Sequence, residues 1–219
     1  MKMFPFAVVI LSSQLTFAAA VQVVQTSADG ARLQSLPALA FQAEDHSSLP
    51  TVTVNPDIGY QKLIGFGGAF TESVATVMNR LPEKKSAEIL GAYFSPGGSN
   101  YSLCRVPIGS CDFSLTSYSY NETPGDTSLD KFSIAHDKEA LIPLIRAAKA
   151  VPGAKFDLLA SPWSPPGWMT TQGRLVARNN HLKREFYGVY ADYLAKYLKA
   201  YDSEGLNISY MTIQNESWN

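Results

Sequence analysis

The sequence contains no block of like charge. Its 18 Lys and Arg residues and 19 Asp and Glu residues give a formal net charge of -1. Nothing in this balance indicates a nucleic-acid surface or a polybasic membrane anchor, so no nucleic-acid partner is expected and no obligate partner is evident. Charged residues make up only 17% of the chain and hydrophobic residues 46%. That ratio is typical of a packed globular core and argues against disorder.

Cysteine and histidine are scarce, which argues against a metal centre. The three histidines stand apart from one another and from any cysteine: His46, His136 and His181. Protein metal sites need several such ligands together, so neither a metal nor another cofactor is predicted, and each histidine is interpreted as a surface or loop residue. Cys104 and Cys111 would lie about 23 Å apart on an extended chain, beyond the reach of a disulfide. Two free, buried thiols are expected unless the chain folds back after Pro107.

No stretch of the chain approaches the roughly 20 apolar residues that a membrane-spanning helix needs. The short apolar run 7–11 follows Lys2, and residues 16–20 end in an Ala-x-Ala pattern. These features are typical of a secretory signal peptide, cut after about Ala20. A secreted or lysosomal-type lumenal location is therefore expected, and an N-terminal membrane anchor is the less favoured interpretation.

Alternating strand and helix patterns fill the chain from residue 65 onward. Four segments have the apolar or β-branched character of strands: 65–70, 101–108, 155–161 and 208–215. Four segments have helical patterns: 72–80, 82–94, 138–150, in which Pro143 predicts a kink or a late start, and 183–202, whose apolar stripe is Phe186, Tyr190, Tyr193, Leu194, Tyr197 and Tyr201. This alternation predicts an α/β fold with parallel strands and right-handed crossovers. Residues 21–64 instead predict short strands of a small accessory β-domain, at 21–26 and 51–54.

Two α/β folds fit this order of elements: a doubly wound open sheet, or the first half of a (β/α)8 TIM barrel. The segment Gly65–Gly68 lacks the third glycine of a dinucleotide-binding motif, so such a site is not expected. Polar and aromatic residues follow each predicted strand: Glu72, Asp112, Trp163 with Trp168, and Asn215 with Glu216. Enrichment at the carboxyl ends of the strands favours the barrel, because barrel enzymes build their sites there. The incomplete barrel is assigned to residues 65–219.

Four motifs occur in a fixed order: Gly65–Glu72 (GFGGAFTE), Arg105–Ser114 (RVPIGSCDFS), Leu159–Met169 (LASPWSPPGWM) and Thr212–Glu216 (TIQNE). Together they resemble the glucosylceramidase-like enzymes of glycoside hydrolase family 30, over roughly residues 50–217. The resemblance implies a retaining β-glycosidase that uses two carboxylates about 5–5.5 Å apart. The implied substrate is a β-linked glucoside, either glucosylceramide or a β-1,6-glucan. A glycolipid substrate would bring peripheral membrane contact.

The resemblance also implies roles for single residues. Glu216 corresponds to the catalytic acid/base, and Asn215 to the group that hydrogen-bonds the sugar 2-hydroxyl. Asp112 corresponds to a carboxylate that binds hydroxyls of the glycone, and Trp163 offers an indole N–H and a ring face to the same sugar. Arg105 corresponds to a positioning arginine. Three of these have structural alternatives that stay open: a loop-capping role for Asp112, core packing for Trp163 and a buried ion pair for Arg105. Trp168 and Tyr120 are interpreted as loop packing.

The sequence departs from the family pattern in two places. Ser217 stands where the family usually has proline. The family's nucleophile, a second Glu at the end of the seventh strand, has no counterpart in the four strand–helix units expected here, since a full barrel takes about 250 residues. The 219-residue chain alone is therefore expected to be inactive. Alternatives are an endo-β-1,6-glucanase of the same family and a non-catalytic sugar-binding fragment.

The chain also contains four Asn-x-Ser/Thr sequons, at Asn100, Asn121, Asn207 and Asn215. A secretory eukaryotic host could attach N-glycans to the first three. Asn215 is expected to remain unmodified, because by resemblance it faces the sugar.

Overall fold

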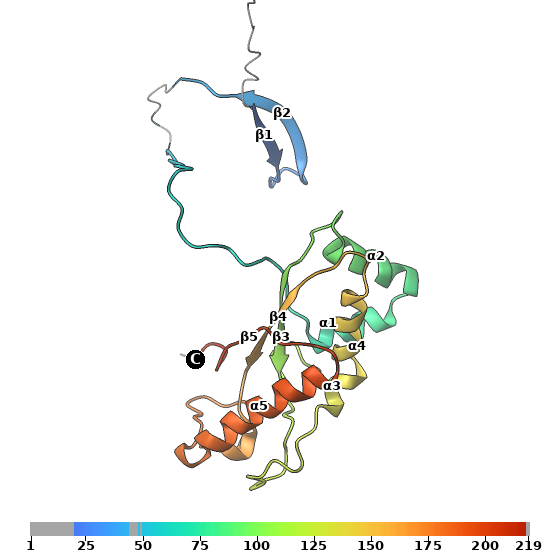
Figure 1. Ribbon diagram of the computed structural model, residues 1–219, viewed down its shortest axis with the longest axis vertical. Coiled ribbons are helices and arrows are strands. Elements are labelled where there is room, and N and C mark those ends of the chain that lie inside the picture. Colours follow the sequence, from blue (N-terminus) through green and yellow to red (C-terminus); the bar gives the residue numbers. More distant parts are fainter. Residues whose placement is uncertain (1–19, 44–47, 49, 218–219) are drawn as a thin grey trace, which may run out of the picture. The chain divides into compact units, whose positions relative to one another are not determined.

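The computed structural model describes residues 20–43, 48 and 50–217 (Figure 1). The chain divides into two compact units between Gly59 and Tyr60. The proposed signal peptide, apart from Ala20, and His46 lie outside the described residues.

The first unit contains one antiparallel hairpin of β1 (Ala20–Gln25) and β2 (Gln34–Ala40), joined through a turn at Gly30. The strand predicted at 21–26 is confirmed. The strand predicted at 51–54 is wrong, because these residues form no strand; β-branched residues favour a strand only where a neighbour offers a surface to pack against. The sequence pattern missed β2 because Pro37 argues against a strand interior.

The second unit contains a parallel sheet in the order β3–β4–β5 (Figure 1). Its strands are β3 (Leu103–Ile108), β4 (Asp157–Pro162) and β5 (Tyr210–Met211). The segment 65–70 lies along the other edge of β3, where Ala69 forms a parallel bridge with Arg105 and Phe70 N–H donates to the Arg105 carbonyl over 2.8 Å. The predicted β-α-β-α-β-α-β order is confirmed, but 65–70 is not a regular strand.

The last strand is shorter than the predicted 208–215. Backbone N–H groups on both sides of β5 nevertheless donate to β4: Ser209 to the Leu158 carbonyl and Thr212 to the Ala160 carbonyl, each over 2.9 Å. Asn215 N–H reaches the Pro162 carbonyl over 2.8 Å. The segment therefore follows β4 as far as the Asn215–Glu216 pair, which fixes where these two residues lie.

The helices cross between consecutive strands. Their bounds are α1 (Glu72–Arg80), α2 (Glu83–Phe94), α3 (Ala135–Glu139), α4 (Leu141–Lys149) and α5 (Tyr187–Ser203), with short 3-10 turns η1 (Gly167–Met169) and η2 (Arg184–Phe186). The hydroxyl of Thr71 caps α1 by accepting the Val74 N–H over 3.3 Å, as a threonine at this position commonly does. The single helix predicted at 138–150 is two helices. Pro143 has no N–H to donate to the Glu139 carbonyl and its ring crowds that carbonyl, so the break falls just before α4.

The core lies between one face of the sheet and the helices. Alternate residues of β3 and β4 are almost fully buried on this face: Cys104, Val106, Ile108, Leu158 and Ala160. Five of the six residues of the stripe predicted on α5 are buried and Phe186 packs against them, which confirms that face of the helix. Arg105 and Ser161 lie at the intervening positions of their strands, so they belong to the opposite face of the sheet.

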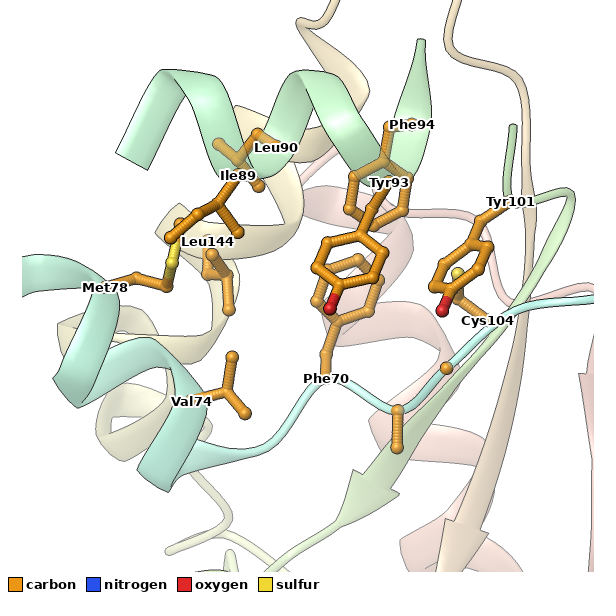
Figure 2. A pocket seen from close by; sticks show the side chains of 12 residues that line it. Phe70, Val74, Met78, Ile89, Leu90, Tyr93, Phe94, Tyr101, Cys104 and Leu144 are labelled. Carbon is orange, nitrogen blue, oxygen red and sulfur yellow. The ribbon is translucent and has the colours of Figure 1, made fainter. Parts of the chain in front are cut away.

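An apolar hollow of about 260 Å³ lies on the helix side of the sheet, between α1 and α2 (Figure 2). Its lining includes Phe70, Met78, Phe94 and Cys104. Phe70 stacks on Phe94 with ring centroids 5.7 Å apart, and burial raises the pKa of the Cys104 thiol. The lining contains no carboxyl, imidazole or amine side chain, so this hollow is a packing feature of the core.

Glycine lets the segment 65–70 approach β3 closely. A Cβ atom built on Gly67 would overlap the Leu103 carbonyl oxygen, and one on Gly65 would lie 2.7 Å from Ser102 Oγ. The contact continues through Phe66, whose carbonyl accepts from Ser102 N–H over 2.8 Å. The small residues of this segment therefore permit a close backbone approach to β3.

Replacing Gly67 with alanine tests this close contact. The new methyl group has no space beside the Leu103 carbonyl, so we expect the free energy of unfolding to fall by about 1–3 kcal/mol, measured by urea denaturation. Gly91, within α2 and with open space around its Cβ position, is the matched control. Gly91→Ala should leave stability unchanged or raise it by about 0.5–1 kcal/mol. Equal effects at the two positions would contradict the contact.

Candidate active site

The five residues singled out from the sequence line one hollow of about 420 Å³: Arg105, Asp112, Trp163, Asn215 and Glu216. They come from β3, from the loop after it, from the loop after β4 and from the turn after β5. These are the carboxyl-end positions where barrel enzymes carry their chemistry. The structure therefore brings together residues that lie as far as 111 positions apart in the sequence.

Arg105, on β3, connects β4 with the segment that follows β5. Its Nη2 donates to Asn215 Oδ1 over 2.7 Å and to Ser161 Oγ over 2.8 Å. Its guanidinium carbon lies 4.5 Å from the centre of the Trp163 ring, a cation–π distance. Thr212 Oγ1 lies 2.6 Å from Ser161 Oγ and extends the network. The arginine thus holds the Asn215 amide and the Ser161 hydroxyl together.

The arginine fixes which way the Asn215 amide points. Because a guanidinium can only donate hydrogen bonds, the atom that it meets must be the amide oxygen, which leaves Nδ2 as a donor. The Gln214 side chain donates to the carbonyls of Trp163 over 2.8 Å and of Asn215 over 2.9 Å.

Glu216, the next residue, has a backbone φ of +45°, a left-handed conformation that is uncommon for glutamate. Such strained residues cluster at functional sites.

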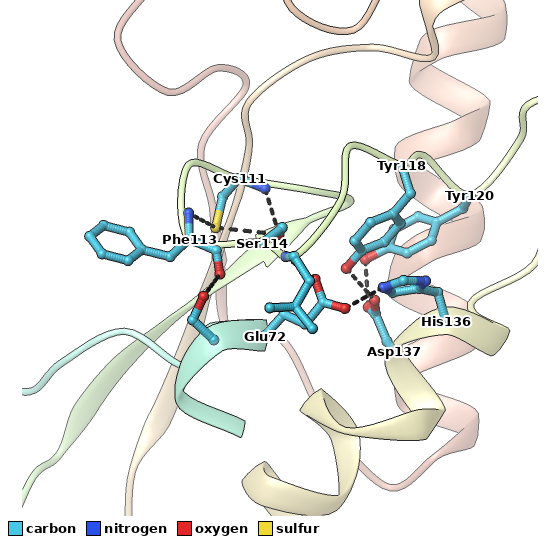
Figure 3. Close-up of polar contacts among 10 residues, drawn as sticks. Glu72, Cys111, Phe113, Ser114, Tyr118, Tyr120, His136 and Asp137 are labelled. Atoms are coloured by element: carbon cyan, nitrogen blue, oxygen red, sulfur yellow. Dashed lines mark hydrogen bonds and ion pairs between the residues drawn. The ribbon is translucent and has the colours of Figure 1, made fainter. Parts of the chain in front are cut away.

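The loop that carries Asp112 is attached to the N-terminus of α1 (Figure 3). The Phe113 carbonyl accepts from Ser73 N–H over 3.0 Å and from Ser73 Oγ over 2.7 Å. Glu72 Oε2 accepts the Leu115 N–H over 2.8 Å. These bonds hold the chain that directly follows Asp112, whose exposed side chain lines the hollow.

Cys111 shapes the same turn. Its N–H donates to Ser114 Oγ over 3.0 Å, and its sulfur accepts from the Phe113 N–H over 3.4 Å. Cys104 and Cys111 are both free, so the expectation of two thiols is confirmed. Cys111 is only half-buried, however, and its burial raises the thiol pKa.

His136 is not the isolated surface residue that the sequence suggested. Its Nε2 lies 2.7 Å from Glu72 Oε1, and its ring stacks on Tyr118 with centroids 3.7 Å apart (Figure 3). Glu72 therefore contacts both α3, through His136, and the loop at Leu115. Glu72 and His136 therefore support the loop that follows Asp112, and neither residue lines the hollow.

Asp137, the next residue of α3, anchors the far end of this long loop. The side chain is 1% exposed and accepts three tyrosine hydroxyls: Tyr118 over 2.8 Å and Tyr120 and Tyr201 each over 2.6 Å. Burial raises the pKa of its carboxyl, and the three hydroxyl donors act in the opposite direction. A buried carboxylate with several donors is well satisfied, so the network holds the loop onto α5 through Tyr201.

Two aromatic residues interpreted as loop packing do pack. Trp168 donates its indole N–H to the Asn121 carbonyl over 3.1 Å and meets Phe186 edge-on at 5.1 Å. Tyr120 stacks on Tyr197 at 5.7 Å. Neither Trp168 nor Tyr120 lines the hollow that contains Arg105. Trp168 instead joins η1 to the loop at Asn121, and Tyr120 packs the same loop against α5.

A second hollow, of about 480 Å³, adjoins the first. It shares Cys111, Asp112 and Trp163 with the first hollow, and it extends to Leu175 and Val176 in the loop after η1.

Within the part of the chain that the structure describes, no group of three or more His, Cys, Asp and Glu residues is arranged to hold a metal ion. No helix of that part is long and apolar enough to cross a membrane.

The sequence reasoning missed Ser161, Thr212 and Gln214 as parts of the site. The sequence could have indicated Ser161 through strand register. Ser161 pairs with Pro107, which lies two positions after Arg105, and residues two apart on a strand share a face. Pairing the two predicted strands in parallel would have placed a hydroxyl beside the arginine.

Comparison with known proteins agrees with this arrangement. The model of the glycosyl hydrolase family 30 TIM-barrel domain matches residues 63–218. Lysosomal acid glucosylceramidase of Mus musculus is 36% identical over 190 residues, which cover 84% of this chain and 37% of the mouse protein. Endo-1,6-beta-D-glucanase of Neurospora crassa is 34% identical over 232 residues, which cover 99% of this chain and 48% of that protein.

Solved structures give the same result. The crystal structure of SrfJ from salmonella typhimurium has a TM-score of 0.77 and 35% identity, covering 90% of this chain and 44% of that one. The endo-beta1,6-glucanase BT3312 has a TM-score of 0.66 and 28% identity, covering 75% of this chain and 37% of that one. The chain thus spans less than half the length of these relatives.

The tyrosine–aspartate network can be tested with two matched substitutions. Tyr201→Phe removes a hydrogen bond to the buried Asp137, so we expect the free energy of unfolding to fall by about 1.5–3 kcal/mol, measured by urea denaturation. The hydroxyl of Tyr190, on the same helix, is buried and has no hydrogen-bond partner. Tyr190→Phe should therefore be neutral or slightly stabilising. An equal loss in both variants would show that packing, and not the bond to Asp137, stabilises the loop.

Proposed function

Because the chain belongs to glycosyl hydrolase family 30, a family of glycoside hydrolases, we propose that it carries the sugar-binding and proton-donating part of a retaining β-glycosidase of the glucosylceramidase type. The observation that supports this most strongly is the shared hollow that contains a carboxyl group, an amide, an arginine and an indole. A sugar requires this combination: hydrogen-bond partners for its hydroxyls and an aromatic face for its C–H groups.

Glu216 is the proposed acid/base. It ends the run that follows β4 and borders the hollow next to Asn215. In the retaining mechanism a carboxylic acid at this position protonates the glycosidic oxygen as the bond to the leaving group breaks. The same group, then a carboxylate, accepts a proton from the water that hydrolyses the glycosyl-enzyme intermediate.

Asn215 is the proposed partner of the sugar 2-hydroxyl. Its Oδ1 already accepts from Arg105 over 2.7 Å, so Nδ2 is the atom left to donate to the 2-oxygen. Arg105 therefore acts as a positioning residue: it holds the amide in one orientation and keeps the Trp163 ring at 4.5 Å. A preset amide needs no reorganisation when its bond to the sugar strengthens in the transition state.

Asp112 and Trp163 are the proposed glycone ligands. The Asp112 carboxylate can accept hydrogen bonds from two neighbouring sugar hydroxyls, which distinguishes sugars by their stereochemistry. Trp163 borders both hollows, so its ring can form one wall of the glucose site. Bonds from Ser73 and Glu72 to the surrounding backbone hold the Asp112 loop in place.

The proposed substrate is glucosylceramide or a related β-glucoside, with a β-1,6-glucan as the alternative. One observation favours the alternative. The second hollow shares Asp112 and Trp163 with the first and offers room for a further sugar ring, which an enzyme acting within a glucan chain needs. A secreted or lumenal location fits either substrate, and glucosylceramide would bring the site to a membrane surface.

A retaining mechanism needs a nucleophile as well as an acid/base. By the family pattern the nucleophile follows the seventh strand, whereas the parallel sheet described here consists of β3, β4 and β5 with the segment 65–70 along its edge. We therefore propose that the 219 residues made alone bind sugar without hydrolysing it. As a binding fragment, the chain would retain Asp112, Trp163 and Asn215.

Sugar binding tests the glycone assignment. Titration of the 219-residue chain with a non-hydrolysable β-glucoside, followed by calorimetry or NMR, should give saturable binding. Asp112→Asn removes a charged acceptor, and a loss of about 1.5 kcal/mol corresponds to an affinity about tenfold weaker. Asp202→Asn, at an exposed position of α5, should bind like the unmodified chain. Equal affinity in the two variants, or no binding in any of them, would contradict the assignment.

Hydrolysis of an aryl β-glucoside tests the missing nucleophile. The 219-residue chain should show no turnover above background, and Glu216→Gln should leave that background unchanged. If the chain hydrolysed the substrate and Glu216→Gln abolished the reaction, the chain would hold a complete catalytic pair. The present proposal would then be wrong, while the role of Glu216 would be supported.

A further inference from the structure

We propose that Asn100 and Asn207 are N-glycan acceptors and that the other two sequons, at Asn121 and Asn215, stay unmodified in the folded protein. The proposal assumes entry into a secretory pathway that attaches N-glycans, and it does not depend on glycosidase activity. An N-glycan is bulky and hydrophilic, so a folded protein accommodates it only where the asparagine side chain faces solvent. The four positions differ sharply in this respect.

Asn121 cannot hold a glycan in this fold. Its side chain is 1% exposed. Its Nδ2, the atom that would carry the sugar, donates to Asp126 Oδ2 over 2.9 Å, and its Oδ1 accepts the Thr123 N–H over 3.1 Å. Its backbone carbonyl accepts the indole N–H of Trp168. Burial therefore argues against the expectation from the sequon at Asn121, because the loop that contains it is packed against η1.

Asn215 is excluded for a different reason. Its amide oxygen accepts from Arg105 over 2.7 Å, and its side chain lines the hollow beside Glu216. A glycan on Nδ2 would occupy the hollow itself. Folding around the Arg105 contact and attachment of a glycan are therefore incompatible at this position.

Asn100 meets the requirement. It is exposed and adopts φ +50° in the turn between α2 and β3. The next residue, Tyr101, packs against Tyr93 with ring centroids 5.2 Å apart, and Ser102 bonds the backbone of Phe66. The neighbours that follow are thus fixed in the fold, while the asparagine projects from a rigid turn.

Asn207 has a similar setting at the end of α5. It is exposed, and it lies between Leu206, which is 1% exposed, and Ser209, whose hydroxyl donates to Asp157 Oδ1 over 2.9 Å. No hydrogen bond of the Asn100 or Asn207 side chain occurs within the described part of the chain. A glycan at either position would displace no internal contact.

The two acceptors also share a position in the sheet. Asn100 precedes β3 and Asn207 precedes β5, so both lie at the amino ends of parallel strands. The hollow with Asp112 and Glu216 lies at the carboxyl ends. The six residues of β3 alone separate the two ends by about 17 Å. Glycans at the amino ends would therefore leave the sugar site open.

Site mapping tests the proposal. The full chain, with its own first 20 residues, is expressed in a yeast or insect secretory host and the folded monomer is isolated by size exclusion. Peptide-N-glycosidase in H₂¹⁸O converts each occupied asparagine into ¹⁸O-labelled aspartate, which mass spectrometry locates. We expect label at Asn100 and Asn207 and none at Asn121 or Asn215. Label at Asn121 or Asn215 in the folded fraction, or none at Asn100 and Asn207, would overturn the proposal.

Substitutions give a second readout that does not require secretion. In microsomes, Asn100→Gln and Asn207→Gln should each remove one glycan-sized step in electrophoretic mobility, and the double variant should migrate like the enzymatically deglycosylated chain. Asn121→Gln is the matched control and should leave the mobility of the protease-resistant chain unchanged. A remaining glycan in the double variant would locate an acceptor elsewhere and contradict the assignment.

Discussion

The site depends on a single cation. Arg105 lies on the face of the sheet opposite the helices, where it bonds Ser161 of β4 and Asn215 in the segment after β5 and lies over Trp163. Its Nη2 atom donates to two neutral oxygen atoms, and its guanidinium lies over an aromatic ring. A guanidinium can make such contacts in several directions at once because its donors form a planar fork. Lysine, with a single point of charge, could not replace it.

Two further sets of hydrogen bonds hold the loop that contains Asp112, which Arg105 does not bond. The N-terminus of α1 binds the Asp112 loop through Glu72 and Ser73, and the buried Asp137 joins the other end of that loop to α5. Both anchors use carboxylates whose partners are supplied by distant parts of the chain. The exposed Asp112 loop therefore rests on buried polar contacts, which is a common way to keep a surface site rigid.

Much of this arrangement could be predicted from the sequence, because it depends on local patterns. The apolar stripe of α5, the cap at Thr71 and the alternation of strands and helices each leave a periodic or positional signal. Features that depend on long-range pairing could not be predicted in this way. The strand β5 is regular only over Tyr210–Met211, and His136 pairs with Glu72 across 64 positions. The burial of Asn121 likewise depends on Asp126 and Trp168, which the sequon does not reveal.

The hydrogen bond between Arg105 and Asn215 joins residues 110 positions apart. Closing a longer loop costs more conformational entropy, so the nearer pairing of β3 with β4 is expected to form before this bond does. Helical content and most of the core could then be in place while the arginine still lacks its amide partner. Ligand binding would therefore report the completion of folding more strictly than circular dichroism, which measures the helices and sheet and not the closure of the site.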